Sequence, residues 1–81
     1  MERLKVAARR TVGTKQTTKA VERGQARVVY VARDAEPHVT RQLLALCRQK
    51  GVEVVVAESM LLLGRACGIE VGTASAGIVS D

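Results

Sequence analysis

The chain has 81 residues, of which 47% are hydrophobic and 26% are charged, and this is the composition of one small folded domain. Tyr30 is the only aromatic residue, so a surface that stacks exposed bases on aromatic rings is disfavoured. Residues 1–27 hold eight basic and two acidic side chains, a net charge of +6, whereas residues 28–81 hold five basic and six acidic ones, a net charge of −1. This asymmetry favours a polyanionic partner. An acidic protein partner, or solubility alone, remains an alternative explanation.

The cysteines and the single histidine form no metal or redox motif. Cys47 and Cys67 have no Cys-x-x-Cys spacing, and His38 is the only histidine, so we expect both cysteines to be small buried hydrophobic residues. Charged residues occur throughout residues 1–10, and no apolar run in the chain is longer than five residues. The sequence therefore predicts no signal peptide, no membrane span and a cytoplasmic location.

Apolar spacing in the first third of the chain predicts two helices. Residues 3–10 carry apolar positions three and four apart, which favours a short helix that is broken at residues 11–13. Thr14 is expected to cap a second helix over residues 15–23, and Gly24 to end it.

The central third predicts a strand followed by a longer helix. Residues 27–32 are rich in β-branched side chains and favour a strand. Asp34 is expected to cap the following helix, with Pro37 in its first turn and Gly51 at its end. One apolar face of this helix is predicted from Val39, Leu43, Leu46 and Cys47.

The last third predicts a strand over residues 52–57, a helix over residues 60–67 capped by Ser59, and a strand of small residues over 72–79. Alternating strands and helices imply an α/β fold, a three-layer α/β/α sandwich covered on both faces. We expect a single domain over residues 1–81 with a small mixed sheet of about four strands, and valine-rich strands that favour a largely parallel core.

A glycine turn leads into the second helix and carries the most informative polar residues. Residues 13–19 read Gly-Thr-Lys-Gln-Thr-Thr-Lys. Free backbone N–H groups at a helix N-terminus attract anions and electronegative base edges. Lys15, Gln16 and Lys19 add cations and an amide to these donors. The alternative is a capped surface helix with solvated lysines. The glycine and lysine spacing of a nucleotide-binding P-loop is absent.

A second segment, residues 58–72, places a short helix between two turns that contain glycine. Ile69 and Val71 follow this helix in a loop. Apolar side chains at such positions either pack back under the helix end or face a partner, and the sequence leaves both alternatives open.

Four blocks, taken together and in this order, resemble the kink-turn RNA-binding ribosomal protein family of the L7Ae and L30e type, above all its small stand-alone bacterial members. The likeness runs over nearly the full chain. The blocks are Gly-Thr-Lys-Gln-Thr-Thr-Lys at 13–19, Ala-Arg-Asp-Ala-Glu-Pro at 32–37, Glu-Ser-Met at 58–60 and Leu-Gly-Arg-Ala-Cys-Gly-Ile-Glu-Val-Gly at 63–72.

The resemblance implies an α/β/α sandwich that binds RNA kink-turns, sharp bends at a short bulge flanked by sheared G·A pairs. It implies a non-catalytic, monomeric protein without metal or cofactor, whose partner is a structured rRNA or regulatory RNA, with the ribosome as a candidate assembly. By position, Gly13, Thr14, Lys15, Gln16 and Lys19 would contact the G·A pairs and nearby phosphates. Ile69, Glu70 and Val71 would hold the bulge nucleotide, and Arg33 completes the expected RNA-binding set.

Two departures from the family pattern concern the same surfaces. Many archaeal and eukaryotic members have Asn-Glu where this chain has Lys15 and Gln16, and an amide offers donors that a carboxylate lacks. Leu61 and Leu62 occupy positions that are usually polar. They mark either scattered surface leucines or a protein contact.

Two other functions compete with RNA binding. A protein-interaction module would use the surface of Leu61 and Leu62, with incidental basic charge. An enzyme is poorly supported, because no carboxylate pair and no nucleophile with a nearby base stands out. His38 is expected to be a solvated turn residue, and Asp34 and Glu36 to be charges at a helix start.

Overall fold

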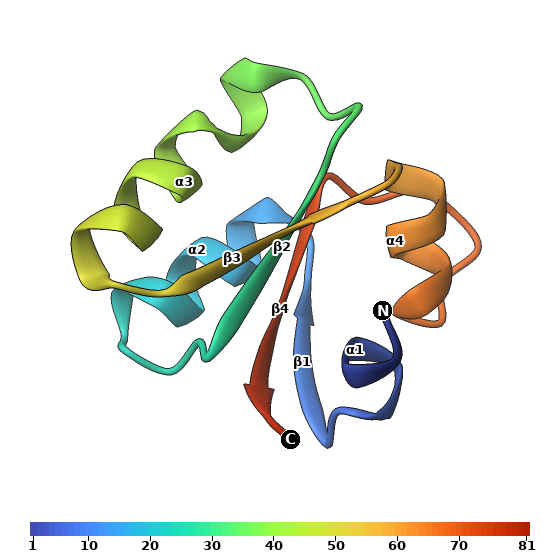
Figure 1. Cartoon of the computed structure of the whole chain (residues 1–81), viewed down its shortest axis with the longest axis horizontal. Helices are drawn as coiled ribbons and strands as arrows, with labels where there is room; N and C mark the ends of the chain where they lie inside the picture. The colour runs from blue at the N-terminus through green and yellow to red at the C-terminus, as the bar shows by residue number, and fades with distance from the viewer.

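The computed structural model describes all of residues 1–81, which form four helices and four strands (Figure 1). In chain order these are α1 (Glu2–Val6), β1 (Arg9–Val12), α2 (Thr14–Glu22), β2 (Val28–Ala32), α3 (Pro37–Lys50), β3 (Glu53–Ala57), α4 (Met60–Ala66) and β4 (Ser75–Ser80).

The strands form one mixed sheet in the order β1-β4-β2-β3. β4 pairs antiparallel with both β1 and β2, whereas β2 and β3 pair in parallel. The predicted mixed sheet of four strands is confirmed. The expectation of a largely parallel core is wrong, because the small-residue strand β4 lies in the middle of the sheet and runs against its two neighbours.

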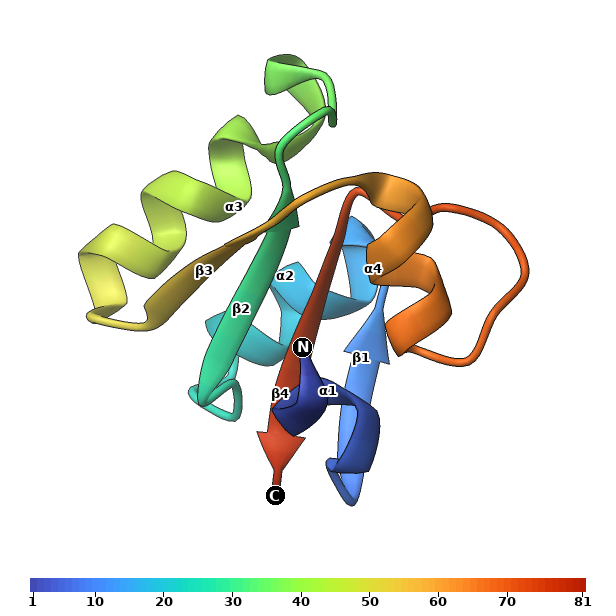
Figure 2. The same ribbon diagram turned by 45° about the vertical axis from the view of Figure 1, so that its right-hand side comes forward.

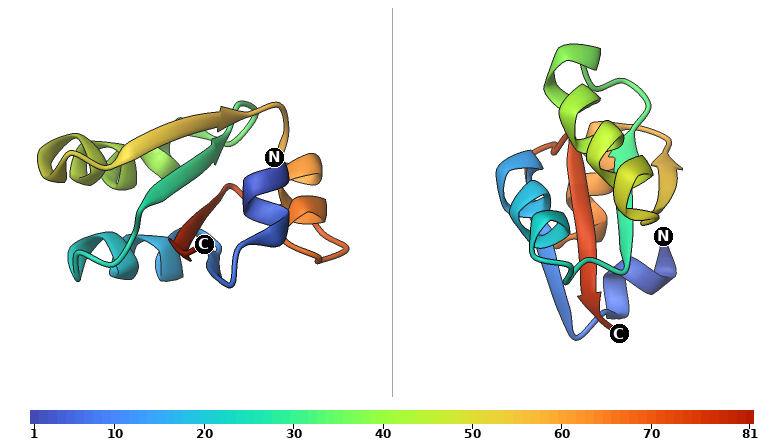
Figure 3. Two further views of the ribbon diagram at one scale, coloured as in Figure 1. Left: turned by 60° about the horizontal axis from the view of Figure 1, so that its bottom comes forward. Right: turned by 90° about the vertical axis from the view of Figure 1, so that its left-hand side faces the viewer.

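Helices cover both faces of the sheet, which confirms the predicted three-layer sandwich. Figure 1 and the left panel of Figure 3 show α1 and α4 on one side of the strands and α2 and α3 on the other. Leu4 and Leu63 lie in the core between the sheet and the first pair of helices. Val21 and Leu43 lie in the core on the second face. Apart from Tyr30, which is buried in the first layer, both layers are built from aliphatic side chains and one cysteine each.

The helix predicted over residues 3–10 ends early, and the last two residues of that segment belong to a strand. α1 stops at Val6, and Arg9–Val12 pairs with β4 as the edge strand β1. The side chain of Arg10 holds this junction, because its guanidinium donates to the carbonyl oxygens of Lys5 (3.4 Å) and Cys67 (3.1 Å). Partners this distant in the sequence decide the conformation, so the local helical spacing misled the prediction.

Two predicted helix caps are wrong and one is confirmed. Ser59 caps α4 by accepting a hydrogen bond from the N–H of Leu62 (3.1 Å). Thr14 is the first residue of α2 rather than its cap, and Gly13 takes the cap position. Asp34 does not cap α3; its carboxylate accepts from the N–H of Met60 instead (2.8 Å). That bond joins the segment after β2 to the start of α4.

Two further predictions need adjustment. α3 ends at Gly51 as predicted, but Thr40 belongs to its buried face, whereas Val39 is exposed and Leu46 is half-buried. β4 begins at Ser75, so the first residues of the strand predicted over 72–79 belong to a loop.

Both cysteines are buried and free, as predicted, and burial raises the pKa of each thiol. None of the helices has the length and apolar character needed to cross a membrane.

Candidate nucleic-acid interface

The sheet topology collects the predicted binding residues at one end of the molecule, called the loop end here. β1, β2 and β3 all end there and β4 begins there, because β4 runs antiparallel to its neighbours. The loop end lies at the top of Figure 1. It comprises the turn at Gly13, the segment 33–36 after β2, residues 58–59 after β3 and the α4–β4 loop, residues 67–74.

The turn into α2 is held by backbone geometry that only glycine adopts readily. Gly13 has φ 92° and ψ 155°, and no atom lies near the position of an added Cβ. Its N–H donates to the carbonyl oxygen of Ser75 (2.9 Å), and its own carbonyl accepts from the N–H of Thr17 (3.0 Å). The turn is therefore fixed to the central strand β4 on one side and to the helix on the other.

The first turn of α2 presents donors to solvent. The N–H groups of its first three residues, 14–16, have no partner within the helix, and no side chain caps them. Lys15 and Gln16 are both exposed, and Lys15 makes no ion pair. The side-chain oxygen of Gln16 accepts from the N–H of Val12 (3.2 Å). That bond fixes the amide so that its NH₂ group is the free half.

Thr14 has a different role from the one predicted for its hydroxyl. Thr14 Oγ1 lies 2.7 Å from Ser75 Oγ, and Thr17 Oγ1 lies 2.8 Å from Thr11 Oγ1. Ser75 and Thr17 are fully buried. These two hydroxyl pairs attach α2 to β4 and β1, so the hydroxyl of Thr14 orients the turn while its N–H faces outward.

The two other predicted cations lie at the margins of this surface. Lys19 is exposed one turn further along α2. Arg33 follows β2 directly, and its guanidinium lies 4.0 Å from the carboxylate of Glu58. Both partners of that ion pair are mostly exposed, so it contributes little to stability and leaves the guanidinium accessible.

The α4–β4 loop is packed tightly onto α4 through backbone contacts. The N–H of Ile69 donates to the carbonyl of Gly64 (3.0 Å), and the N–H of Thr73 donates to that of Met60 (3.1 Å). An added Cβ at Gly64 would overlap the carbonyl oxygen of Val71. Figure 2 shows the loop swinging out beside α4.

Within this loop the predicted residues differ in exposure. Val71 is 68% exposed, and Glu70 is exposed as well, whereas Ile69 is half-buried. The backbone of Ile69 is bonded to α4 through the carbonyl of Gly64, while its side chain remains partly accessible. Val71 presents its apolar side chain to solvent.

Three residues that hold the surface in place were missed. Gly64 permits the close approach of the loop, and its sequence signal was a glycine inside a helical segment. Ser75 joins the α2 turn to the α4–β4 loop, because its carbonyl also accepts from Thr73 Oγ1 (2.9 Å). Arg10, in β1, holds the end of α4 by donating a hydrogen bond to the carbonyl of Cys67. Neither Ser75 nor Arg10 carries a local signal of this role.

The chain belongs to the ribosomal protein L7Ae/L30e/S12e/Gadd45 family, whose model matches residues 1–81. The match covers all the helices and strands described above.

Three individual proteins are similar to the chain over most of its length. A Bacillus pumilus protein named RNA-binding protein is 47% identical over 68 residues, which are 84% of this chain and 83% of the relative. The large ribosomal subunit protein eL8 of Halobacterium salinarum is 48% identical over 69 residues, 84% of this chain but 58% of the relative. The solved structure of the Giardia lamblia 15.5kD RNA binding protein matches with a TM-score of 0.87 and 33% identity, over 99% of this chain and 68% of that one.

Proposed function

We propose that this chain is a non-catalytic RNA-binding protein that recognises kink-turns and stabilises their bent form. The observation that supports the proposal most is the placement of Lys15 and Gln16: both are exposed in the first turn of α2, at the same end of the sheet as Val71. Relatives named as RNA-binding and as a ribosomal subunit protein support the same partner class.

Recognition in this proposal combines two kinds of contact. The free N–H groups at the start of α2, with Lys15, Gln16 and Lys19, face the G·A pairs and adjacent phosphates. An undistorted A-form major groove is too narrow for side chains, but a sharp bend opens it. Ile69, Glu70 and Val71 hold the unstacked bulge nucleotide, and Arg33 contacts the backbone between these two regions. Binding shifts the RNA towards its bent conformer without chemical change.

A gel-shift comparison tests this function. The probe is a kink-turn RNA, and the reference is the same RNA with its G·A pairs replaced by Watson–Crick pairs. The wild-type protein is expected to bind the kink-turn at least tenfold more tightly, because one tenfold step corresponds to about 1.4 kcal/mol, a modest contact difference. Equal affinity for the two RNAs would refute kink-turn recognition.

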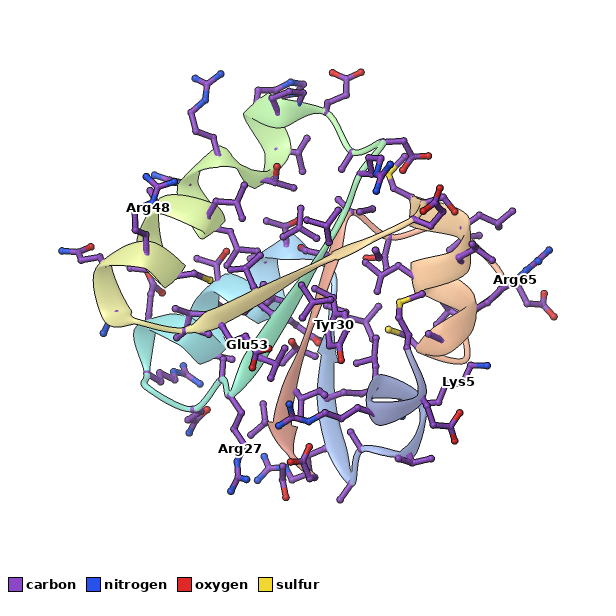
Figure 4. The ribbon with its side chains drawn as sticks, viewed as in Figure 1. Lys5, Arg27, Tyr30, Arg48, Glu53 and Arg65 are labelled. Carbon is purple, nitrogen blue, oxygen red and sulfur yellow. The ribbon has the colours of Figure 1, made fainter.

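Variants of α2 refine the same test. Lys15→Ala and Gln16→Ala are expected to weaken kink-turn binding far more than binding to the reference RNA. Arg48→Ala is the matched control, because it removes an exposed charge at the far end of α3 (Figure 4). If Lys15→Ala reduces binding to both RNAs equally, the lysine supplies only general phosphate attraction.

The proposal extends to the setting of the protein. We infer that residues 1–81 act as a single domain and a monomer in the cytoplasm, on ribosomal or regulatory RNA. Co-sedimentation with ribosomal subunits at rising salt distinguishes the two targets, since a ribosomal component remains bound and a regulatory protein is recovered free.

A protein-interaction module is the second candidate, and one observation favours it. Leu61 and Leu62 are 47% and 42% exposed on α4, next to the α4–β4 loop. The double variant Leu61→Ser, Leu62→Ser is expected to leave kink-turn affinity unchanged. If the wild-type protein shifts no kink-turn RNA while this pair of leucines is required for capture of a purified protein partner, the second function replaces the first.

A further inference from the structure

A basic hollow lies beside the surface described so far and overlaps it at Gln16 and Lys19. It has a volume of about 190 Å³ and lies between the outer side of α2 and the edge strand β1. The right panel of Figure 3 shows these two elements side by side. Its polar lining comes mainly from Arg9, Arg10, Thr11, Gln16, Lys19 and Arg23. We call it the α2–β1 hollow.

The charges around the α2–β1 hollow have no acidic counterpart. No aspartate or glutamate lines it, and the ion pairs of the protein involve Arg3, Arg27, Arg33 and His38 but none of the lining residues. Glu22, the one acidic residue of α2, lines a different hollow, against α3. Three cationic side chains, those of Arg9, Lys19 and Arg23, are thus gathered without compensation, whereas the guanidinium of Arg10 is bound to the carbonyls of Lys5 and Cys67. Their mutual repulsion is relieved by a bound polyanion.

The shape of the hollow favours a polymer over a small anion. It is partly open to solvent, and it shares Gln16 with the first turn of α2. From Gln16 to Arg23 the chain advances seven residues, about 10 Å along a helix. One strand of a duplex presents about three phosphates over that length. Arginine, which supplies two of the three free cations, binds phosphate oxygens in a bidentate manner.

We propose that the α2–β1 hollow binds the phosphate backbone of one of the two RNA stems that flank the kink-turn. The inference rests on the proposed function, because it continues the RNA path from Gln16 along α2. It adds a second contact area that does not depend on the RNA sequence. The first turn of α2 recognises the bent region, and the α2–β1 hollow binds the phosphate backbone of the adjoining stem. Arg9, Lys19 and Arg23 supply the free cations.

Stem length is the variable that tests the inference. Three RNAs share one kink-turn: the first has two long stems, and each of the others has one stem shortened so that it ends near the bend. The protein variant is Arg9→Gln, Arg23→Gln. The control is Arg41→Gln, Arg48→Gln, which removes the same charge from exposed positions of α3 outside the hollow. Affinities are measured by fluorescence anisotropy at several salt concentrations.

The hollow variant is expected to bind the long-stem RNA about tenfold more weakly than the wild type, with a salt slope smaller by about one to two units. On one of the two shortened RNAs it should match the wild type, and that RNA identifies the stem. The α3 control should match the wild type on all three. The inference is overturned if the hollow variant binds every RNA as the wild type does, if it loses affinity equally on all three, or if the control loses as much.

Failure of this inference is distinguishable from failure of the proposed function. If the wild-type protein prefers the kink-turn to its Watson–Crick counterpart but shows no stem-length effect, only the α2–β1 hollow is rejected. If the wild type shows no such preference, kink-turn recognition is rejected together with the flanking-stem assignment, whatever the hollow variant does. Thermal unfolding of both double variants verifies that each is folded, which is expected because all four substituted arginines are exposed.

Discussion

The turn into α2 and the α4–β4 loop lie at the same end of the sheet but are held in place by different means. The turn is anchored by hydrogen bonds to strands on either side, from Gly13 and Thr14 to Ser75 and from Thr17 to Thr11. The loop is anchored by close backbone packing on α4, where Gly64 leaves no room for a side chain. The polar surface at the start of α2 is thus positioned by hydrogen bonds. The apolar surface of the α4–β4 loop is positioned mainly by the close packing of its backbone on α4.

The largest effect on stability is expected from a substitution that disturbs the packing of the α4–β4 loop on α4. Gly64→Ala places a methyl group on the carbonyl of Val71, so the loop or the helix must move. We expect a loss of about 1–3 kcal/mol in the free energy of unfolding, as for other overpacked sites, and weaker binding of the bulge nucleotide. Denaturant unfolding and gel shift measure the two effects. Leu62→Ala, at an exposed position of the same helix, is the control and should change stability by less than about 0.5 kcal/mol.

The next largest effect on stability is expected at Gly13, in the hydrogen-bonded turn into α2. Gly13→Ala forces a side chain into a backbone conformation at φ 92° that costs about 1–3 kcal/mol, although the added Cβ meets no neighbour. We expect lower stability together with a loss of kink-turn affinity, measured by thermal unfolding and anisotropy.

Gly24→Ala provides the matched control at the other end of the same helix. Gly24 also has positive φ, 70°, and also has open space around its Cβ position. We expect a stability loss of about 1 kcal/mol with unchanged RNA affinity. Loss of affinity in both variants to the same degree would mean that general destabilisation, rather than the geometry of the turn, governs binding.

A smaller and more selective effect is expected at the apolar side of the interface. Val71→Ser should leave the free energy of unfolding within about 0.5 kcal/mol of the wild type, because the side chain is 68% exposed. Kink-turn affinity should fall several-fold as the bulge nucleotide loses an apolar contact. Val6→Ser is the counterpart, since Val6 is 66% exposed on α1, and it should change neither quantity. An RNA affinity insensitive to Val71 would remove the bulge-nucleotide contact from the proposal.

The smallest effect belongs to the opposite end of the sheet, where Arg3 donates to the carboxylate of Asp81. This hydrogen bond holds the pKa of Asp81 below its ordinary value of 3.8. The contribution to stability is therefore present above that value and is lost as the pH falls through the lower pKa of the folded state. Thermal unfolding of Arg3→Gln and of the wild type should differ slightly at pH 7 and converge near pH 2. A difference that persists in acid would show that Arg3 acts through packing instead.

The elements with strong local signals were predictable, and those decided by distant partners were not. The valines of β2, the cap at Ser59 and the stop at Gly51 are set by neighbours in the sequence, and the structure confirms them. The prediction of a helix at Arg9 and Arg10 is wrong because β1 gains its strand conformation only by pairing with β4, more than sixty residues later.

In the candidate site, too, features set by local sequence were predictable and features set by distant contacts were not. The exposure of Lys15 and Gln16 follows from their place at a helix start, which the sequence indicated. The engagement of the Thr14 hydroxyl by Ser75, and the need for glycine at position 64, depend on contacts between segments that are remote or on opposite sides of a turn. No local pattern encodes such contacts, so a single sequence could not reveal them.

The bonds that converge on Ser75 have a kinetic consequence. Because one buried residue ties the α2 turn to the α4–β4 loop, the two halves of the surface are already ordered relative to each other before any RNA arrives. The protein therefore loses little conformational entropy on association. The rate-limiting step is then the bending of the RNA. We expect stopped-flow traces in which the observed rate levels off, at high protein concentration, at the speed with which the free RNA folds its own bend.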